Sequence, residues 1–124
     1  MAKKVGEHIT LDIIGTKKEY APSFYEKLVY KIAKKAKVTV LEISKHKFEP
    51  QGFTMVALLA ESHISFHTFP EKGIISFDFF TCGKVSPSVA IDILKKEIEH
   101  NRIVKKEFNR DTVALYDDIY SSPG

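Results

Sequence analysis

The side chains of this chain that could do chemistry are gathered in residues 60–71 and 80–83. These two stretches contain two histidines, three hydroxyls in the first stretch, two carboxylates and Cys82, the only cysteine. Polar groups in strand-like segments cost free energy unless they are paired or solvated. Taken singly, each residue also fits an ordinary structural role, such as sheet polarity or, for the cysteine, a small buried hydrophobe. Their concentration indicates a functional site.

A metal site is one chemistry that these residues suggest. His63 and His67 lie on one face of a predicted strand, and Cys82 offers a thiolate ligand. At ~3.3 Å per residue, however, the two histidines are about 13 Å apart, too far for both to bind one ion. We therefore expect no metal. A serine hydrolase is another alternative, but the chain lacks the nucleophile-elbow pattern of that class.

The elements that must position these side chains follow from hydrophobic periodicity. Period-two alternation and apolar runs predict strands, and helical spacing of apolar residues predicts two helices with Ser23 and Ser86 as N-caps. The last two strands are expected to form a closing hairpin. We expect strands over residues 8–14, 37–43, 53–60, 62–69, 75–82, 102–108 and 112–115, and helices over residues 24–36 and 86–100.

This order of elements predicts a single α+β domain over residues 1–124. Short turns between consecutive strands favour an antiparallel sheet, and two amphipathic helices can cover only one of its faces. The result is a two-layer sandwich whose open face carries aromatic and polar residues together. A second copy of the chain could cover that face, which predicts a homodimer with facing sheets and four αββα layers.

Composition narrows the class of protein. The chain has 124 residues, 44% of them hydrophobic and 28% charged, as in an ordinary globular domain. The net charge of +3 comes with lysines in short clusters on predicted helix faces, so we expect no nucleic-acid partner. The chain has no long apolar run of the kind that predicts a signal peptide or a membrane span. Its single cysteine fits a cytoplasmic protein.

Three motifs resemble one family. Glu61-Ser62-His63, then residues 67–71 (His-Thr-Phe-Pro-Glu), then Thr81-Cys82-Gly83 are similar, in sequence and spacing, to the short prokaryotic form of S-adenosylmethionine decarboxylase. Residues 46–48 and 52–54 and the overall length fit as well. Two positions depart from the pattern: Thr54 stands where Ser is usual, and Phe69 where Trp is common.

The resemblance implies a proenzyme that cleaves itself between Glu61 and Ser62 into chains 1–61 and 62–124. The Ser62 hydroxyl attacks the Glu61 carbonyl, the peptide bond becomes an ester, and elimination and hydrolysis leave a covalent pyruvoyl group at position 62. That ketone replaces pyridoxal phosphate as the electron sink for decarboxylation, by forming a Schiff base with the substrate amine. The implied substrate is S-adenosylmethionine, and the implied pathway is spermidine (polyamine) biosynthesis.

The resemblance also implies roles for individual residues. His67 is the base of the elimination, and Thr54 supplies the hydroxyl that steadies the ester-forming intermediate. Cys82 is the acid that protonates the product carbon. The substrate-binding residues implied are Glu71, which accepts hydrogen bonds from the ribose hydroxyls, Phe48, which stacks on adenine, and Phe69, which packs against the substrate.

The spacing of Ser62 and His67 bears on whether the site lies within one chain or between two protomers. Ser62 and His67 are five residues apart in one predicted strand, so they lie on opposite faces and about 16 Å apart. Within one chain they cannot meet. The resemblance implies an active site assembled at a dimer interface with groups from both protomers, and this geometry agrees with that arrangement. We therefore predict that His67 and Glu71 of one protomer serve Ser62 and Cys82 of the other.

Two alternatives remain at this point. A branch of the same family decarboxylates arginine, and its self-cleavage motifs have the same appearance. A catalytically silent α+β binding module is the alternative of another class, and it predicts an intact chain without an amine-reactive carbonyl.

Overall fold

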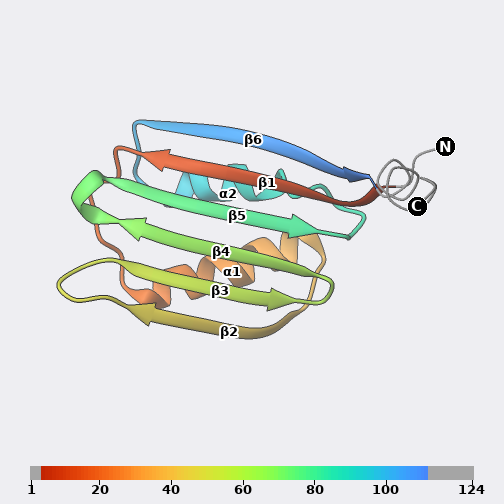
Figure 1. Cartoon of the computed structure of the whole chain (residues 1–124), viewed down its shortest axis with the longest axis horizontal. Helices are drawn as coiled ribbons and strands as arrows, with labels where there is room; N and C mark the ends of the chain where they lie inside the picture. Colours follow the sequence, from red (N-terminus) through yellow and green to blue (C-terminus); the bar gives the residue numbers. More distant parts are fainter. Residues whose placement is uncertain (1–3, 112–124) are drawn as a thin grey trace, which may run out of the picture.

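A computed structural model describes residues 4–111 as one antiparallel sheet with two helices against one of its faces (Figure 1). The strands are β1 (Lys4–Ile14), β2 (Val40–Lys47), β3 (Phe53–Leu59), β4 (Ser62–Phe69), β5 (Ile74–Thr81) and β6 (Arg102–Asp111). The helices are α1 (Pro22–Ala36), α2 (Val89–Glu97) and a single 3-10 turn, η1 (Pro70–Lys72). The predicted two-layer α+β class is confirmed.

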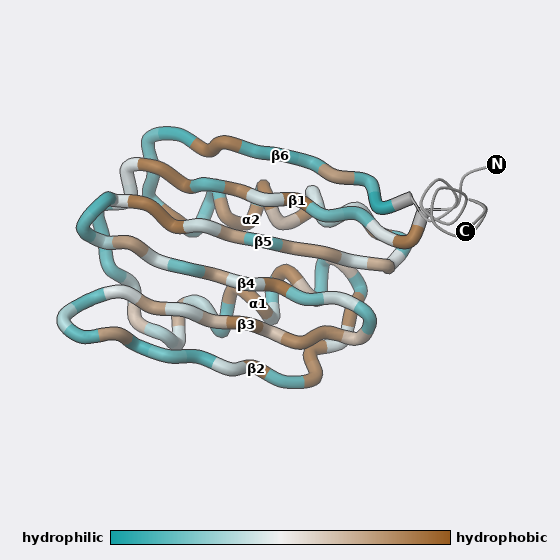
Figure 2. Tube along the Cα trace, in the orientation of Figure 1, coloured by the Kyte–Doolittle hydropathy of each residue, from teal (hydrophilic) through white to brown (hydrophobic). Residues whose placement is uncertain are grey.

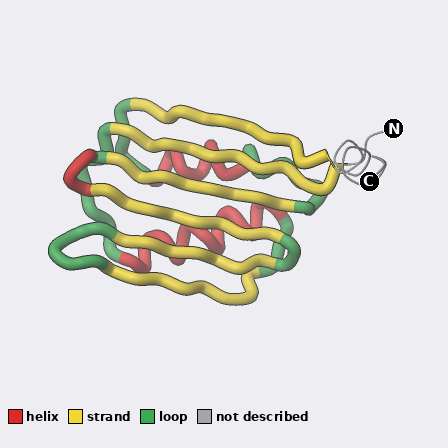
Figure 3. The backbone as a smooth tube through the Cα atoms, viewed as in Figure 1, coloured by secondary structure: helices red, strands yellow, loops and turns green. Residues whose placement is uncertain are grey.

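The strand order in the sheet is β2-β3-β4-β5-β1-β6, and every neighbouring pair is antiparallel. Strands β2 to β5 form a meander, and β1 inserts between β5 and the last strand, β6. Both helices lie behind the same face of the sheet (Figure 3). The central position of β4 and β5 matters for function, because they carry most of the motif residues.

The core lies between the sheet and the helices. Alternate residues of the central strands are buried on this inner face, including Met55, Phe66 and Phe77, and polar and apolar residues alternate along the strands (Figure 2). From α1, Leu28 and Tyr25 pack onto it. Burial raises the pKa of the Tyr25 phenol well above its ordinary value, and the nearby Tyr20 and Glu19 add to this.

Several element boundaries differ from the sequence prediction. Helix α1 begins at Pro22, with Ala21 as its N-cap, so Ser23 lies inside the helix and does not cap it. The same helix ends at Ala36, and its C-cap Lys37 has a left-handed φ of 59°, so β2 starts at Val40 instead of residue 37. At the N-terminal end of the described residues, β1 starts at Lys4, earlier than predicted, because its first residues pair with β6.

The prediction of a closing hairpin is wrong about where its first strand ends. Strand β6 continues to Asp111, through the residues expected to form the turn, because it pairs with β1 along its whole length. Residues 112–115 lie outside the described residues. Helix α2 is also shorter than predicted: the segment before it forms turns in which the Ser86 carbonyl accepts from the Val89 N–H, and the helix ends at Glu97.

The second face of the sheet is not covered by either helix. Its exposed large apolar side chains come from several strands and are Val56, Leu58, Phe69 and Phe108. Between them lie polar side chains such as His67 and Asp78. We call this surface the open face. None of the helices in the described part of the chain is long and apolar enough to cross a membrane.

Candidate active site

The proposed cleavage position lies in the tight turn between β3 and β4. Leu59 pairs with Ser62, so only Ala60 and Glu61 form the loop of this hairpin. Glu61 has a φ of 57°, in the left-handed region that residues with a Cβ rarely adopt. Such a conformation costs about 1–3 kcal/mol and persists only where the surrounding structure imposes it. The residue whose carbonyl Ser62 would attack is therefore held in a strained backbone conformation.

Ser62 lies beside the end of β5, which brings the third motif next to the first. The Ser62 hydroxyl is buried and donates a hydrogen bond to Thr81 Oγ1 at 3.1 Å. The Gly83 backbone N–H donates to the same oxygen at 2.9 Å. Cys82 follows directly and is exposed. We call Glu61, Ser62, Thr81 and Cys82 the cleavage end of the site.

A second group of motif residues lies at the opposite end of β4. Thr54 Oγ1 and His67 Nδ1 are within hydrogen-bond distance at 3.1 Å, because β3 and β4 pair these residues directly. Both lie on the open face. The chain then continues through Phe69, which is exposed, into η1, which carries Glu71. We call Thr54, His67, Phe69 and Glu71 the base end of the site.

A shallow hollow on the open face adjoins the base end. It has a volume of about 330 Å³, and Phe69 and Ser76, the residue paired with His67, line it. Asp12 also lines it and accepts a hydrogen bond from the Ser76 hydroxyl at 3.0 Å. Phe48 lies outside this hollow, beyond the end of β2, where its exposed ring packs edge-on against His46 at 4.6 Å between centroids.

Within one protomer, the cleavage end and the base end do not meet. The burial pattern of β4 places Ser62 on the inner face and His67 on the open face, as their odd spacing predicts. Five strand residues also separate them by about 16 Å along β4. The structure thus pairs Ser62 with Thr81, the residue before Cys82, and Thr54 with His67, but it leaves the proposed nucleophile far from the proposed base.

Some polar contacts of the site could not be found from the sequence. On the open face, Asp78 accepts a hydrogen bond from the Ser65 hydroxyl and lies 3.0 Å from His8 Nε2. His8 is 70 positions from Asp78 and shares no motif with it, so only the pairing of β1 with β5 reveals the contact. The sequence identified Thr81 only as a member of the third motif and did not predict its contact with Ser62.

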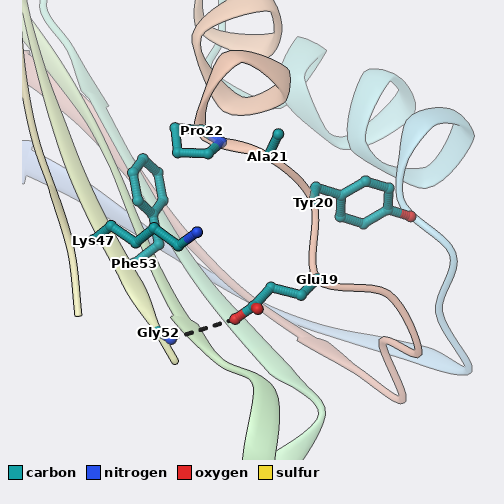
Figure 4. A pocket seen from close by; sticks show the side chains of 7 residues that line it. All are labelled: Glu19, Tyr20, Ala21, Pro22, Lys47, Gly52 and Phe53. Carbon is teal, nitrogen blue, oxygen red and sulfur yellow. Dashed lines mark hydrogen bonds between the residues drawn. The ribbon is translucent and has the colours of Figure 1, made fainter. Parts of the chain in front are cut away.

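A small hollow of about 190 Å³ adjoins the base end and is lined by Thr54, Val56 and His46, whereas a larger pocket lies apart from the site. A pocket of about 270 Å³ lies between the start of α1 and the β2–β3 loop, where the Glu19 carboxylate accepts from the Gly52 N–H (Figure 4). It contains none of the predicted site residues. Across residues 4–111, no three His, Cys, Asp or Glu side chains gather closely enough to hold a metal ion.

Comparison with known proteins agrees with these motifs. The family model of S-adenosylmethionine decarboxylase matches residues 7–111, which is nearly all of the described chain. The S-adenosylmethionine decarboxylase proenzyme of Parasynechococcus marenigrum is 38% identical over 122 residues, which cover 96% of this chain and 95% of that protein. The chain belongs to the S-adenosylmethionine decarboxylase family.

Relatives from other lineages and a solved structure extend this result. The proenzyme of the same description from Methanococcus vannielii is 37% identical over 116 residues, covering 91% of this chain and 95% of the relative. The crystal structure of the adenosylmethionine decarboxylase from Aquifex aeolicus superposes with a TM-score of 0.78 at 35% identity, over 88% of this chain and 92% of that one. Sequence and fold therefore agree on the family.

Proposed function

We propose that this chain decarboxylates S-adenosylmethionine for polyamine synthesis, using a pyruvoyl group made from Ser62 after cleavage of the Glu61–Ser62 bond. The observation that carries the proposal is the cleavage end itself. A strained Glu61, a buried Ser62 hydroxyl and the exposed Cys82 lie at the same end of the sheet, where the β3–β4 turn and the end of β5 are neighbours. Membership of the family supplies the reaction that this arrangement supports.

The residues at position 62 and around it fit a pyruvoyl group. Ser62 begins a strand directly after a two-residue turn, so cleavage there leaves the new N-terminus anchored by the pairing of β4 with β5. Once formed, the pyruvoyl group supplies the electron sink that removal of carbon dioxide requires. Cys82 lies one residue beyond Thr81, which pairs with Ser62, and this neighbourhood supports a role for its thiol in delivering a proton to the product carbon.

At the base end, His67 and Thr54 are suited to proton transfer. The contact between Thr54 Oγ1 and His67 Nδ1 fixes the orientation of the imidazole. In the tautomer whose Nδ1–H donates to Thr54, the Nε2 atom is unprotonated and can take a proton from a partner. Because Thr54 retains a hydroxyl, the replacement of the usual Ser preserves this contact. His67 in this position serves as the base that removes the Ser62 Cα proton during elimination.

Substrate binding is assigned to the surroundings of the base end. Glu71 offers two carboxylate oxygens for a pair of ribose hydroxyls, and it lies in a 3-10 turn that projects from the end of β4. Phe48 and Phe69 are exposed aromatic rings near the same end of the sheet, suited to contact the adenine base and the rest of the nucleoside.

A homodimer with facing open faces completes this site. The exposed Val56, Leu58 and Phe108 form apolar positions on a face that nothing else in the described chain covers, and exposed apolar surface of this kind marks interaction sites. The cleavage end and the base end lie at opposite ends of β4. A two-fold axis that lies between the facing sheets and crosses β4 at right angles brings each end next to the other end of the partner.

Intact mass spectrometry under denaturing conditions tests the proposal first. We expect two fragments, 1–61 and 62–124, with the second lighter by one ammonia than a peptide that starts with Ser62. Release of carbon dioxide from S-adenosylmethionine, with arginine as the parallel substrate, then identifies the reaction. A chain that stays uncut after long incubation contradicts self-cleavage, and activity on arginine alone contradicts the proposed substrate.

A further inference from the structure

Thr81 has no role in the cleavage chemistry described so far, yet it makes the only side-chain hydrogen bond of the Ser62 hydroxyl seen in the described chain. The two residues are paired across β4 and β5. Thr81 is almost fully buried, with 1% of its surface exposed, and Ser62 is buried with 6% exposed. The contact between their oxygens is therefore shielded from water.

The hydrogen bonds of Thr81 fix the position of its oxygen. A threonine hydroxyl has one proton to donate and can accept two hydrogen bonds. Thr81 Oγ1 accepts from Ser62 at 3.1 Å and from the Gly83 N–H at 2.9 Å, so both accepting positions are filled. The Gly83 amide holds the oxygen in place, and the Thr81 proton can turn toward Ser62 once the Ser62 hydroxyl has lost its own proton.

We propose that Thr81 assists self-cleavage, first by orienting the Ser62 hydroxyl and then by donating a hydrogen bond to the same oxygen as it leaves. The inference rests on the proposed self-cleavage of the chain. In the first step, Ser62 Oγ bonds to the Glu61 carbonyl carbon, the carbon–nitrogen bond between the two residues breaks, and the hydroxyl proton ends on the Ser62 nitrogen. The product is an ester whose Oγ atom no longer carries a proton.

The second step reverses the direction of the contact. A base removes the Ser62 Cα proton, the Cβ–Oγ bond breaks, and its electron pair stays on Oγ, which departs as an oxygen of the Glu61 carboxylate. Negative charge therefore develops on the atom that Thr81 touches. Rotation of the Thr81 proton turns this contact into a donated hydrogen bond without moving any heavy atom, and such charge-assisted bonds are strongest in buried sites.

A purely structural role predicts a different outcome. If Thr81 only ties the end of β5 to the turn at Gly83, its loss changes folding stability but not the balance between the two chemical steps. If it stabilises the leaving oxygen, its loss slows elimination more than ester formation, and the ester accumulates. Hydroxylamine distinguishes these cases, because it cleaves an ester and leaves an ordinary peptide bond intact under mild conditions.

The test compares the precursors of wild type, Thr81→Val, Thr81→Ser and Thr68→Val by intact mass against time. Thr68 is the matched control, because it is also a buried threonine on the inner face, and its Oγ1 atom has no hydrogen-bond partner in the described chain. We expect Thr81→Val to slow spontaneous cleavage by about 100-fold, the effect of removing one donor to a developing oxyanion. Thr81→Ser and Thr68→Val should stay close to wild type.

Hydroxylamine added to the Thr81→Val precursor should release fragment 1–61 as a hydroxamate, together with a fragment that still begins with Ser62. Cleavage of Thr81→Val at the wild-type rate, or a slowed variant that hydroxylamine does not cut, overturns the role of Thr81. If Thr81→Val does not fold by circular dichroism, Thr81→Ala takes its place under the same criteria. A wild-type chain that never cleaves overturns the proposed function instead, and this inference with it.

Discussion

Mixing two inactive variants tests whether the active site is shared between protomers. Ser62→Ala removes the proposed nucleophile, and His67→Ala removes the proposed base, so neither homodimer should cleave. A heterodimer of the two contains one intact site, in which Ser62 of the His67→Ala chain faces His67 of the Ser62→Ala chain. The opposite site lacks both groups.

The size of the effect follows from the geometry of β4. A general base must come within about 3 Å of the proton it removes, but within a protomer Ser62 and His67 are on opposite faces and about 16 Å apart along the strand. In a shared site, every His67→Ala chain in a heterodimer is therefore cleaved, and no Ser62→Ala chain is. Random pairing of equal amounts places about half of the His67→Ala chains in heterodimers.

The assay uses co-expression with two affinity tags and tandem purification of the heterodimer, followed by intact mass of each chain. A heterodimer of wild type with Ser62→Ala is the control, since its wild-type chain should be cleaved by the partner's intact His67. If purified heterodimers of the two variants stay uncut while that control is cleaved, His67 does not act across the interface. Cleavage of the His67→Ala homodimer would show that His67 is not the base.

Four further perturbations have defined outcomes. Cys82→Ala should still yield fragments 1–61 and 62–124 but lose at least about 100-fold in turnover, measured by carbon dioxide release, and full activity would remove the thiol from the mechanism. Leu58→Glu puts a charge on the open face, where this side chain is 51% exposed, and should give a folded but uncut monomer in sedimentation. The control, Tyr30→Glu, is on the exposed side of α1 at 58% exposure and should leave the dimer intact; equal behaviour of both variants would argue against the open-face interface. Thr68→Val should raise the unfolding free energy measured in urea by about 1 kcal/mol, because it removes a buried hydroxyl that has no hydrogen-bond partner in the described chain. A loss of stability would mean that this hydroxyl does have a hydrogen-bond partner. Because burial raises the pKa of Tyr25 in the folded state, its contribution to stability is complete below the unfolded pKa of about 10 and is lost as the pH rises further. Tyr25→Phe should therefore flatten the fall of the unfolding free energy with pH in alkali. An unchanged slope would contradict burial as the cause.

The sequence predicted the layers of the fold because periodicity is a local signal. Alternation in residues 62–69 assigned Ser62 and His67 to opposite faces, and the burial of β4 agrees. Helix spacing identified both helices, although capping residues misplaced their starts at Ser23 and Ser86. The closing hairpin failed for a non-local reason: whether β6 turns or continues depends on its pairing with β1, nearly the whole chain away.

The motifs by themselves identified the family, through the residue types and spacing around Ser62 and Cys82. Contacts between these motifs were decided only by the tertiary structure. Pairing of β4 with β5 places Thr81 against Ser62, pairing of β3 with β4 places Thr54 against His67, and the order of the strands leaves one whole face open. These contacts depend on which strands lie side by side, and strand register is set by burial of a common core, which no local stretch of sequence contains.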